Sequence, residues 1–305
     1  MKAYLVIAGL TQAGELARIG SLGETMKERS WWQRVTVSAF VVACGVYMMG
    51  CSCLVFGQSK LVYFPTKEID WTPARAGLRY EDVTLTAAKG QTINAWYVPC
   101  EGARGTVIFA HGNGENISWL FDYVEFYRTL KMNVFLFDYR GYGRSTGKPS
   151  EKATYEDVTA CWKYLTEERK VPANKIVLSG RSLGGAVVAW LAAREKPAGL
   201  VLESTFTSVP DMGAEIFPWL PVRLIARIHY DTKAIIGDIR CPILVAHSPT
   251  DDVIPYKHGR KLYELAQAPK RFAELRGDHN CSPWEKGSTY ASALDEFLTE
   301  CLSTN

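Results

Sequence analysis

The sequence predicts an α/β protein built on a mostly parallel, doubly wound sheet, with an N-terminal antiparallel hairpin and a short lid insertion. Three observations predict this class. Six short apolar runs occur between residues 106 and 277, and helical-length segments separate most of them, as is typical of buried parallel strands. Residues 80–87 and 91–98 alternate apolar and polar side chains around a short Ala-Lys-Gly turn, which indicates a hairpin. Finally, 305 residues, 47% hydrophobic and 22% charged, suit one such domain with an N-terminal extension.

The extension contains a long uncharged run. No charged residue occurs between Arg34 and Lys60, and residues 35–56 exceed the roughly 20 residues that a helix needs to cross a bilayer. Basic residues precede the run, and Trp31 and Trp32 fall where an interfacial aromatic belt is expected. We therefore expect a tail over residues 1–34 and a membrane anchor over residues 35–57. The charge bias predicts that the C-terminal domain lies on the non-cytoplasmic side of the membrane.

A cleaved segment is the alternative to an uncut anchor. A basic region followed by an apolar run also describes a signal peptide. Residues 48–51, Met-Met-Gly-Cys, loosely resemble a bacterial lipoprotein box, in which Cys51 would become the lipidated N-terminus. Met26 would be a more typical start for such a signal. A buried helix of a soluble core is a third interpretation, which the length of the run disfavours.

Residues 61–305 have the pattern of one domain. After the hairpin, strands are expected at residues 106–110, 133–138, 175–180, 199–204, 242–247 and 271–277. About 35–40 residues separate the fourth and fifth of these runs, too many for one crossover helix. The intervening segment, about residues 207–235, is rich in proline and large apolar residues, and we interpret it as a lid. An ordinary helical insertion packed on the sheet is the alternative.

The turn after the third of these strands carries a candidate nucleophile. Gly180 and Gly184 flank Ser182 in the pattern G-x-S-x-G, directly between an apolar strand and a helix-forming run. Such a sharp turn exposes the serine hydroxyl and leaves room around it. Because the five residues also arise by chance in glycine-rich turns, the pattern needs partners elsewhere in the chain.

Two later strand ends supply these partners. Asp251 and Asp252 follow the strand at residues 242–247, and His279 follows the last strand. Carboxyl ends of parallel strands meet at one edge of the sheet, where their loops form a crevice. The chain order Ser, Asp, His is the order that the α/β-hydrolase fold requires. The expected nucleophile, acid and base are therefore Ser182, one of the two aspartates, and His279.

A glycine-rich loop follows the strand at residues 106–110. We expect the backbone N–H groups of Asn113 and Leu183 to form an oxyanion hole, since Leu183 directly follows the nucleophile. His111 is expected to brace the loop by hydrogen bonding, and His229 and His258 are expected to be surface residues. The charged residues of "DYRGYGR", residues 138–144, are expected to fix a tight loop rather than bind a substrate.

Other classes of function receive little support. The net charge is only +3, and basic residues do not cluster with aromatics, so no nucleic-acid partner is expected. The eight cysteines include no C-x-x-C pair, so neither a zinc site nor any other metal is expected. No nucleotide loop or cofactor fingerprint occurs, so no cofactor is implied.

The chain from about Leu61 onward resembles the α/β-hydrolase-domain (ABHD) serine hydrolases, and specifically their membrane-anchored, Bem46-like branch. The resemblance rests on "FAHGNGEN", "DYRGYGRSTGKPSE", "GRSLGGAVV", "ESTFTSVPDM", "DDVIP" and "DHN". It implies that Ser182 is the nucleophile, His279 the base and Asp251 the acid, because Asp251 and Pro255 match the family spacing Asp-x-x-(Val/Ile)-Pro. Ser248 departs from the family's usual His-Gly, at a position expected on the rim of the site.

The function expected is hydrolysis of carboxylic esters or thioesters through an acyl-enzyme intermediate. The membrane anchor and the family's depalmitoylating members favour lipid or acyl-protein substrates. An apolar wall for an acyl chain is expected from four residues: Phe206, Phe217, Trp219 and Leu220. The alternatives are a serine peptidase of the same fold and a non-catalytic, membrane-tethered interaction protein. The oligomeric state stays open.

Overall fold

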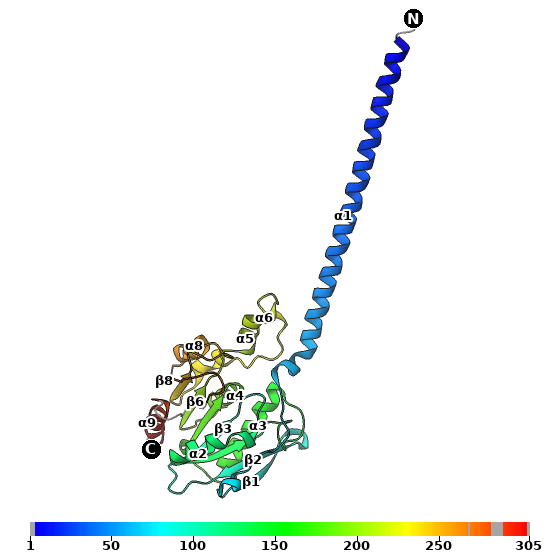
Figure 1. Cartoon of the computed structure of the whole chain (residues 1–305). Helices are drawn as coiled ribbons and strands as arrows, with labels where there is room; N and C mark the ends of the chain where they lie inside the picture. The colour runs from blue at the N-terminus through cyan, green and yellow to red at the C-terminus, as the bar shows by residue number, and fades with distance from the viewer. Residues whose placement is uncertain (1–3, 268, 282–288, 304–305) are drawn as a thin grey trace. The chain divides into compact units, whose positions relative to one another are not determined.

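The structure is a computed structural model that describes residues 4–267, 269–281 and 289–303. The chain divides into two compact units, Met1–Phe56 and Gly57–Asn305 (Figure 1). One helix, α1 (Tyr4–Val62), fills the described part of the first unit and ends within the second. The segment expected as a tail is therefore helical from Tyr4 onward. Among the described residues, Ser30–Val62 is the one helical stretch long and apolar enough to cross a membrane, with a mean hydropathy of 2.1.

The second unit is built on an eight-stranded sheet, in the order β1-β2-β4-β3-β5-β6-β7-β8. The strands are β1 (Glu81–Thr86), β2 (Thr92–Val98), β3 (Gly105–Ala110), β4 (Met132–Phe137), β5 (Ile176–Arg181), β6 (Gly199–Glu203), β7 (Ile243–His247) and β8 (Lys270–Glu274). Strand β2 pairs antiparallel with both β1 and β4, and all other neighbours are parallel. The predicted hairpin, the six later strands and the α/β-hydrolase fold are thus confirmed.

Helices cover both faces of the sheet. Strand side chains alternate between the faces, so Ile108 packs with one apolar cluster while Val107 and Phe109 pack with the other. The first cluster includes buried residues of α3 (Glu151–Lys163), α4 (Leu183–Ala192) and α8 (Lys257–Leu265). The second includes residues of α2 (Phe121–Thr129) and α9 (Thr289–Ser303). The central strands are largely apolar, and they are buried because both faces of the sheet are covered.

Shorter helices make the connections. The segment expected as a lid, residues 207–235, contains α5 (Val209–Ile216), α6 (Val222–Ile225) and α7 (Thr232–Ile235). Figure 1 shows α5 and α6 at the margin of the hydrolase unit, near α8, and Glu215 of α5 pairs with Lys257 of α8 at 3.0 Å. The remaining short elements are η1 (Pro73–Ala76), η2 (Ala88–Gly90), η3 (Ile117–Trp119), the π-helical turn η4 (Tyr164–Glu168) that extends α3, η5 (Ala173–Lys175) and η6 (Ile236–Asp238).

Candidate active site

Ser182 lies at the turn between β5 and α4, in the middle of the sheet. Its backbone has φ 52° and ψ −118°, a conformation that non-glycine residues rarely adopt. The flanking glycines make this turn possible through close packing. A Cβ on Gly180 would overlap the Gly184 carbonyl, and a Cβ on Gly184 would overlap the carbonyl of Ala110 in β3. The pattern G-x-S-x-G therefore has a steric cause here at both glycines.

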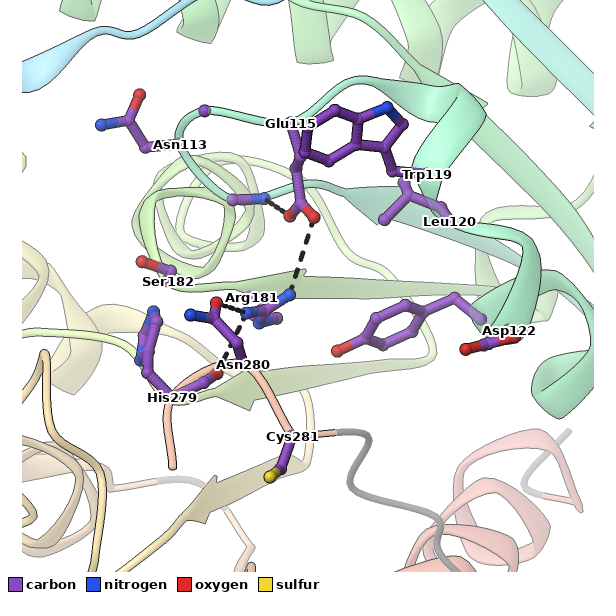
Figure 2. A pocket seen from close by; sticks show the side chains of 13 residues that line it. Asn113, Glu115, Trp119, Leu120, Asp122, Arg181, Ser182, His279, Asn280 and Cys281 are labelled. Carbon is purple, nitrogen blue, oxygen red and sulfur yellow. Dashed lines mark hydrogen bonds and ion pairs between the residues drawn. The ribbon is translucent and has the colours of Figure 1, made fainter. Parts of the chain in front are cut away.

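Asp251 and His279 lie against each other at the ends of β7 and β8. His279 Nδ1 is 2.9 Å from Asp251 Oδ2 and 3.1 Å from Oδ1, and both side chains are buried. Figure 2 shows the imidazole of His279 beside Ser182, and both residues line one cavity. The structure thus brings together the three side chains that the sequence predicts to act together.

The Asp251 carboxylate is held in its ionised form. Burial by itself raises its pKa, but hydrogen bonds from His247, His279 and the Ile254 N–H outweigh burial and hold the pKa of Asp251 well below its usual range. The Ile254 and Val253 N–H groups donate to Oδ1 at 2.7 and 3.0 Å. A carboxylate fixed in this way keeps its charge facing the imidazole at neutral pH.

The neighbouring Asp252 has a different contact. Its Oδ1 accepts a hydrogen bond of 3.0 Å from the backbone N–H of His279, and the side chain is exposed. Asp252 therefore braces the histidine loop, whereas Asp251 faces the ring. This geometry agrees with the choice of Asp251 as the candidate acid.

The two residues expected to donate to an oxyanion lie at different elements: Asn113 in the loop after β3, and Leu183 at the start of α4. Leu183 is the first residue of α4, so its N–H has no acceptor within the helix. Asn113 is anchored through its side chain, which accepts from the Phe64 N–H at 3.0 Å and from the Tyr142 hydroxyl at 2.8 Å. His111 is fully buried, with Nδ1 2.7 Å from the Gly112 carbonyl, in agreement with a bracing role.

A half-buried ion pair between Glu115 and Arg181 connects this loop to the histidine loop. Glu115 accepts from the Gly112 N–H at 2.7 Å and lies 3.6 Å from the Arg181 guanidinium. Arg181 also donates to the His279 carbonyl at 3.0 Å and to Asn280 Oδ1 at 2.8 Å (Figure 2). Arg181 directly precedes Ser182, so one side chain touches both loops that flank the candidate nucleophile. Sequence reasoning missed this role, although Arg181 is the first variable position of the G-x-S-x-G pattern.

The cavity beside Ser182 has a volume of about 480 Å³ and a mostly polar lining. Its described lining comprises residues 112–115, Trp119, Leu120, Asp122, Tyr123, Arg181, Ser182 and residues 279–281. None of the four residues expected to form an apolar wall belongs to this lining, so that expectation is wrong. Phe206 is buried in the core, and Trp219, in the segment expected as a lid, is 68% exposed.

Two further expectations need correction. His258 is buried rather than exposed, because α8 packs it against Thr207, whose hydroxyl lies 2.9 Å from His258 Nδ1. His229 is exposed, as expected. Ser248, expected on the rim, is buried and donates to the Gly277 carbonyl at 2.5 Å, and Thr250 donates to the same carbonyl at 2.8 Å. The departure from the family pattern therefore lies between the acid loop and the histidine loop.

The charged residues after β4 are structural. Asp138 accepts from the Ile117 N–H at 3.0 Å, and burial raises the pKa of Asp138 to about 7. Arg140 is buried and pairs with Asp157 at 2.6 Å. Arg144 pairs with Asp82 at 3.0 Å, where both side chains are exposed. Within the described part of the chain, no three histidine, cysteine or acidic residues are grouped to hold a metal ion.

Comparison with known proteins identifies the family of this chain. A family model described as serine aminopeptidase, S33 (Hydrolase_4), matches residues 101–235. The esterase Pf2001 of Pyrococcus furiosus shares the fold, with a TM-score of 0.66 at 22% identity over 78% of this chain and 99% of that protein. Acetyl xylan esterase 1 from Thermoanaerobacterium does so with a TM-score of 0.59 at 19% identity, over 73% of this chain and 84% of that one.

Relatives found by sequence share a higher identity with this chain than these two solved structures do. An uncharacterised protein of Mycobacterium tuberculosis is 34% identical over 263 residues, 85% of this chain and 92% of the relative. An uncharacterised membrane protein of Saccharomyces cerevisiae is 32% identical over 257 residues, 80% of this chain and 89% of the relative. The α/β hydrolase domain-containing protein WAV2 of Arabidopsis thaliana is 33% identical over 283 residues, 83% of this chain and 91% of the relative. Because relatives at this identity align along most of both chains, the chain belongs to the α/β-hydrolase-domain family.

Proposed function

We propose that the protein is a membrane-anchored serine hydrolase that cleaves carboxylic esters or thioesters through an acyl-enzyme intermediate. One observation carries the proposal: the buried hydrogen bond between Asp251 and His279 ends at the cavity that Ser182 lines. An ionised acid, an oriented imidazole and an exposed hydroxyl are the parts that nucleophilic acyl transfer requires.

Each residue then has a role in the reaction. His279 Nε2 takes the proton of the Ser182 hydroxyl as Oγ bonds to the acyl carbon, and the carbonyl π electrons move onto its oxygen. The N–H groups of Asn113 and Leu183 donate to this oxyanion. As the oxyanion collapses, the bond to the leaving oxygen or sulfur breaks and His279 protonates the leaving group. Water, deprotonated by His279, attacks the acyl-enzyme in the same way and regenerates Ser182. Asp251 stabilises the imidazolium in both halves.

The cavity favours short or polar acyl groups over long chains. The apolar and aromatic side chains in its described lining are those of Trp119, Leu120 and Tyr123, besides Cys281. The lining also contains three charged residues: Glu115, Asp122 and Arg181. Esterases are among the solved structures of this fold, which agrees with ester substrates. We therefore expect rates on a p-nitrophenyl ester series to be highest for the shortest acyl chains.

The anchor is proposed from α1. The uncharged run between Arg34 and Lys60 lies within one continuous helix, and the yeast relative is named a membrane protein. The basic residues before the run support a hydrolase domain on the non-cytoplasmic side. Accessibility of this domain to protease in intact cells tests the side. Intact mass distinguishes an uncut chain from one that begins at an acylated Cys51.

A serine peptidase is the second candidate, because the matching family model is described as a serine aminopeptidase. The carboxylate of Asp122 in the cavity lining would attract the ammonium group of a peptide N-terminus, whereas Glu115 is already paired with Arg181. Aminoacyl p-nitroanilides, measured beside the ester series, separate the two activities. Faster turnover of the anilides would favour the peptidase.

Ser182→Ala tests the nucleophile, with Ser150→Ala as a matched control. Ser182→Ala should abolish hydrolysis and labelling by a fluorophosphonate probe, while leaving the fold intact. Ser150 caps α3 through its side chain, so its alanine variant should lose about 1 kcal/mol of stability yet retain labelling. Substantial turnover by Ser182→Ala would refute the assignment. Absence of turnover and labelling in the wild type would favour a non-catalytic interaction protein.

A further inference from the structure

The lid carries exposed apolar side chains that neither the core nor the proposed cavity uses. Ile216, Trp219 and Leu224 are 56%, 68% and 86% exposed, and none of them lines the cavity beside Ser182. They lie within nine residues of one another in sequence, on and between α5 and α6. Large apolar residues clustered in one exposed segment mark an interaction surface.

The lid is fixed to the end of α1. Gln58 donates from Nε2 to the Ile225 carbonyl at 2.8 Å, and its Oε1 accepts from the Arg227 N–H at 2.7 Å. Tyr63, just after the helix, shares a hydrogen bond of 2.9 Å with Tyr230. The same amide side chain thus contacts the lid on both sides of Ala226, which holds the lid backbone at this level of the helix.

The hydrogen bonds of Gln58 to the lid determine how near the lid lies to the bilayer surface. The uncharged run ends at Lys60, whose ammonium group belongs at a headgroup level if the run spans the bilayer. Gln58 lies two residues before Lys60, and a helix rises only about 1.5 Å per residue. Ile225 and Arg227, bonded to Gln58, must then lie at the bilayer surface as well, with Leu224 next to them in the chain.

The composition of this segment suits an anionic lipid surface. Residues 216–230 contain Arg223 and Arg227 and lie between Glu215 and Asp231; Arg223 pairs with Asp211 at 3.3 Å, but its side chain stays 69% exposed. Arginine and lysine near an anionic leaflet are attracted to its headgroups, and tryptophan is enriched at the boundary between headgroups and acyl chains. Leu224 and Ile216 supply the apolar area that an interfacial segment buries.

We infer that the lid, through Ile216, Trp219 and Leu224, inserts into the headgroup region of the same bilayer that α1 spans. The inference rests on the proposed membrane anchor, and it adds a second membrane contact that belongs to the hydrolase domain. Bilayer contact would hold α5 and α6 at the lipid surface, so that substrates presented by that surface meet the domain from the lid.

Photo-crosslinking of the full-length protein tests this inference. p-Benzoylphenylalanine replaces Trp219 or Leu224 in protein reconstituted into vesicles of phosphatidylcholine and phosphatidylserine. Two matched controls carry the same group at Phe40, within the uncharged run, and at Glu167, exposed on η4 outside the lid. After irradiation, mass spectrometry should find lipid adducts at Trp219, Leu224 and Phe40, and none at Glu167.

The controls separate the possible failures. Adducts at Phe40 without adducts at Trp219 and Leu224 would overturn the lid contact and leave the anchor intact. No adducts at Phe40 would overturn the anchor and the inference together. Crosslinks from Trp219 or Leu224 to a second copy of the chain, in place of lipid, would identify the apolar segment as a protein interface and also overturn the inference. None of these outcomes depends on hydrolase activity.

A functional comparison gives a second readout. Because Trp219 and Leu224 lie outside the cavity, the double variant Trp219→Ser/Leu224→Ser should hydrolyse a short water-soluble ester at the wild-type rate. Its lipid contact should weaken, seen as loss of adducts from the benzoyl group placed at Ile216. Unchanged adduct yield at Ile216 would contradict a contact made by these side chains.

Discussion

Replacing Asp251 with asparagine removes the charge that faces His279 and leaves the side-chain volume unchanged. In the native site one carboxylate accepts from His279 Nδ1 at 2.9 Å and from two backbone N–H groups, of Val253 and Ile254. An asparagine has one acceptor oxygen and one amide group. If the oxygen keeps the two backbone donors, the amide group faces Nδ1 and forces the ring proton onto Nε2.

The expected loss follows from this change of tautomer. A ring protonated at Nε2 cannot take the Ser182 proton, and comparable triads lose about 10⁴ in kcat, equivalent to about 5 kcal/mol of transition-state stabilisation. The free energy of unfolding should fall by only about 1–3 kcal/mol, because one buried hydrogen bond is impaired. Activity should therefore fall far more than stability does.

Asp252→Asn is the matched control. Asparagine retains an oxygen that can accept from the His279 N–H, the contact that Asp252 makes at 3.0 Å. Its kcat should stay within about tenfold of the wild type, since a single exposed hydrogen bond is at stake. Hydrolysis of p-nitrophenyl acetate and thermal unfolding followed by circular dichroism measure both effects. Equal losses in the two variants, or an Asp251→Asn enzyme within tenfold of the wild type, would refute the assigned geometry.

Substitutions at three other residues test further features of the structure. Arg181→Lys should lower kcat less than Arg181→Met, because Arg181 orients the His279 carbonyl. In both variants, KM for a neutral short ester should be nearly unchanged. A loss confined to thermal stability would contradict this positioning role. Gly184→Ala should fail to accumulate as folded protein, measured by soluble yield and circular dichroism, since a Cβ there overlaps the Ala110 carbonyl; a folded, active variant would show that the turn can relax. Asp138 has its pKa raised to about 7 by burial, from about 3.9 when unfolded, so native stability should fall by about 3 kcal/mol as pH rises from 4 to 7. Asp138→Asn, which retains the oxygen that accepts from Ile117, should flatten this dependence in denaturant titrations at several pH values, and an unchanged slope would assign it to other groups.

The fold could be predicted because its signals are local. Each central strand contains a short, mostly apolar run, and the hairpin alternates apolar and polar residues, so the period and length of these patterns give the element type. The candidate site could be predicted in part for the same reason: parallel topology brings the ends of β5, β7 and β8 to one edge. Ser182, Asp251 and His279 each follow one of these strands directly.

The contacts between loops could not be predicted from local patterns. The Glu115–Arg181 pair joins residues 66 positions apart, and the hydrogen bond between Ser248 and Gly277 joins loops after different strands. His258 is buried because its partner, Thr207, comes from a segment 51 residues earlier. The expected apolar wall was wrong for the same reason. The apolar composition of residues 207–235 does not say where these residues pack, and none of them belongs to the described cavity lining.

The backbone of Ser182 has a consequence for how this protein would respond to selection. A serine at φ 52° and ψ −118° costs about 1–3 kcal/mol that a glycine there would largely avoid. A library selected for heat resistance alone should therefore enrich Ser182→Gly, together with loss of hydrolysis. Selection that also demands turnover should retain the serine and find its stabilising changes elsewhere. At this one position, stability and activity make opposite demands on the same side chain.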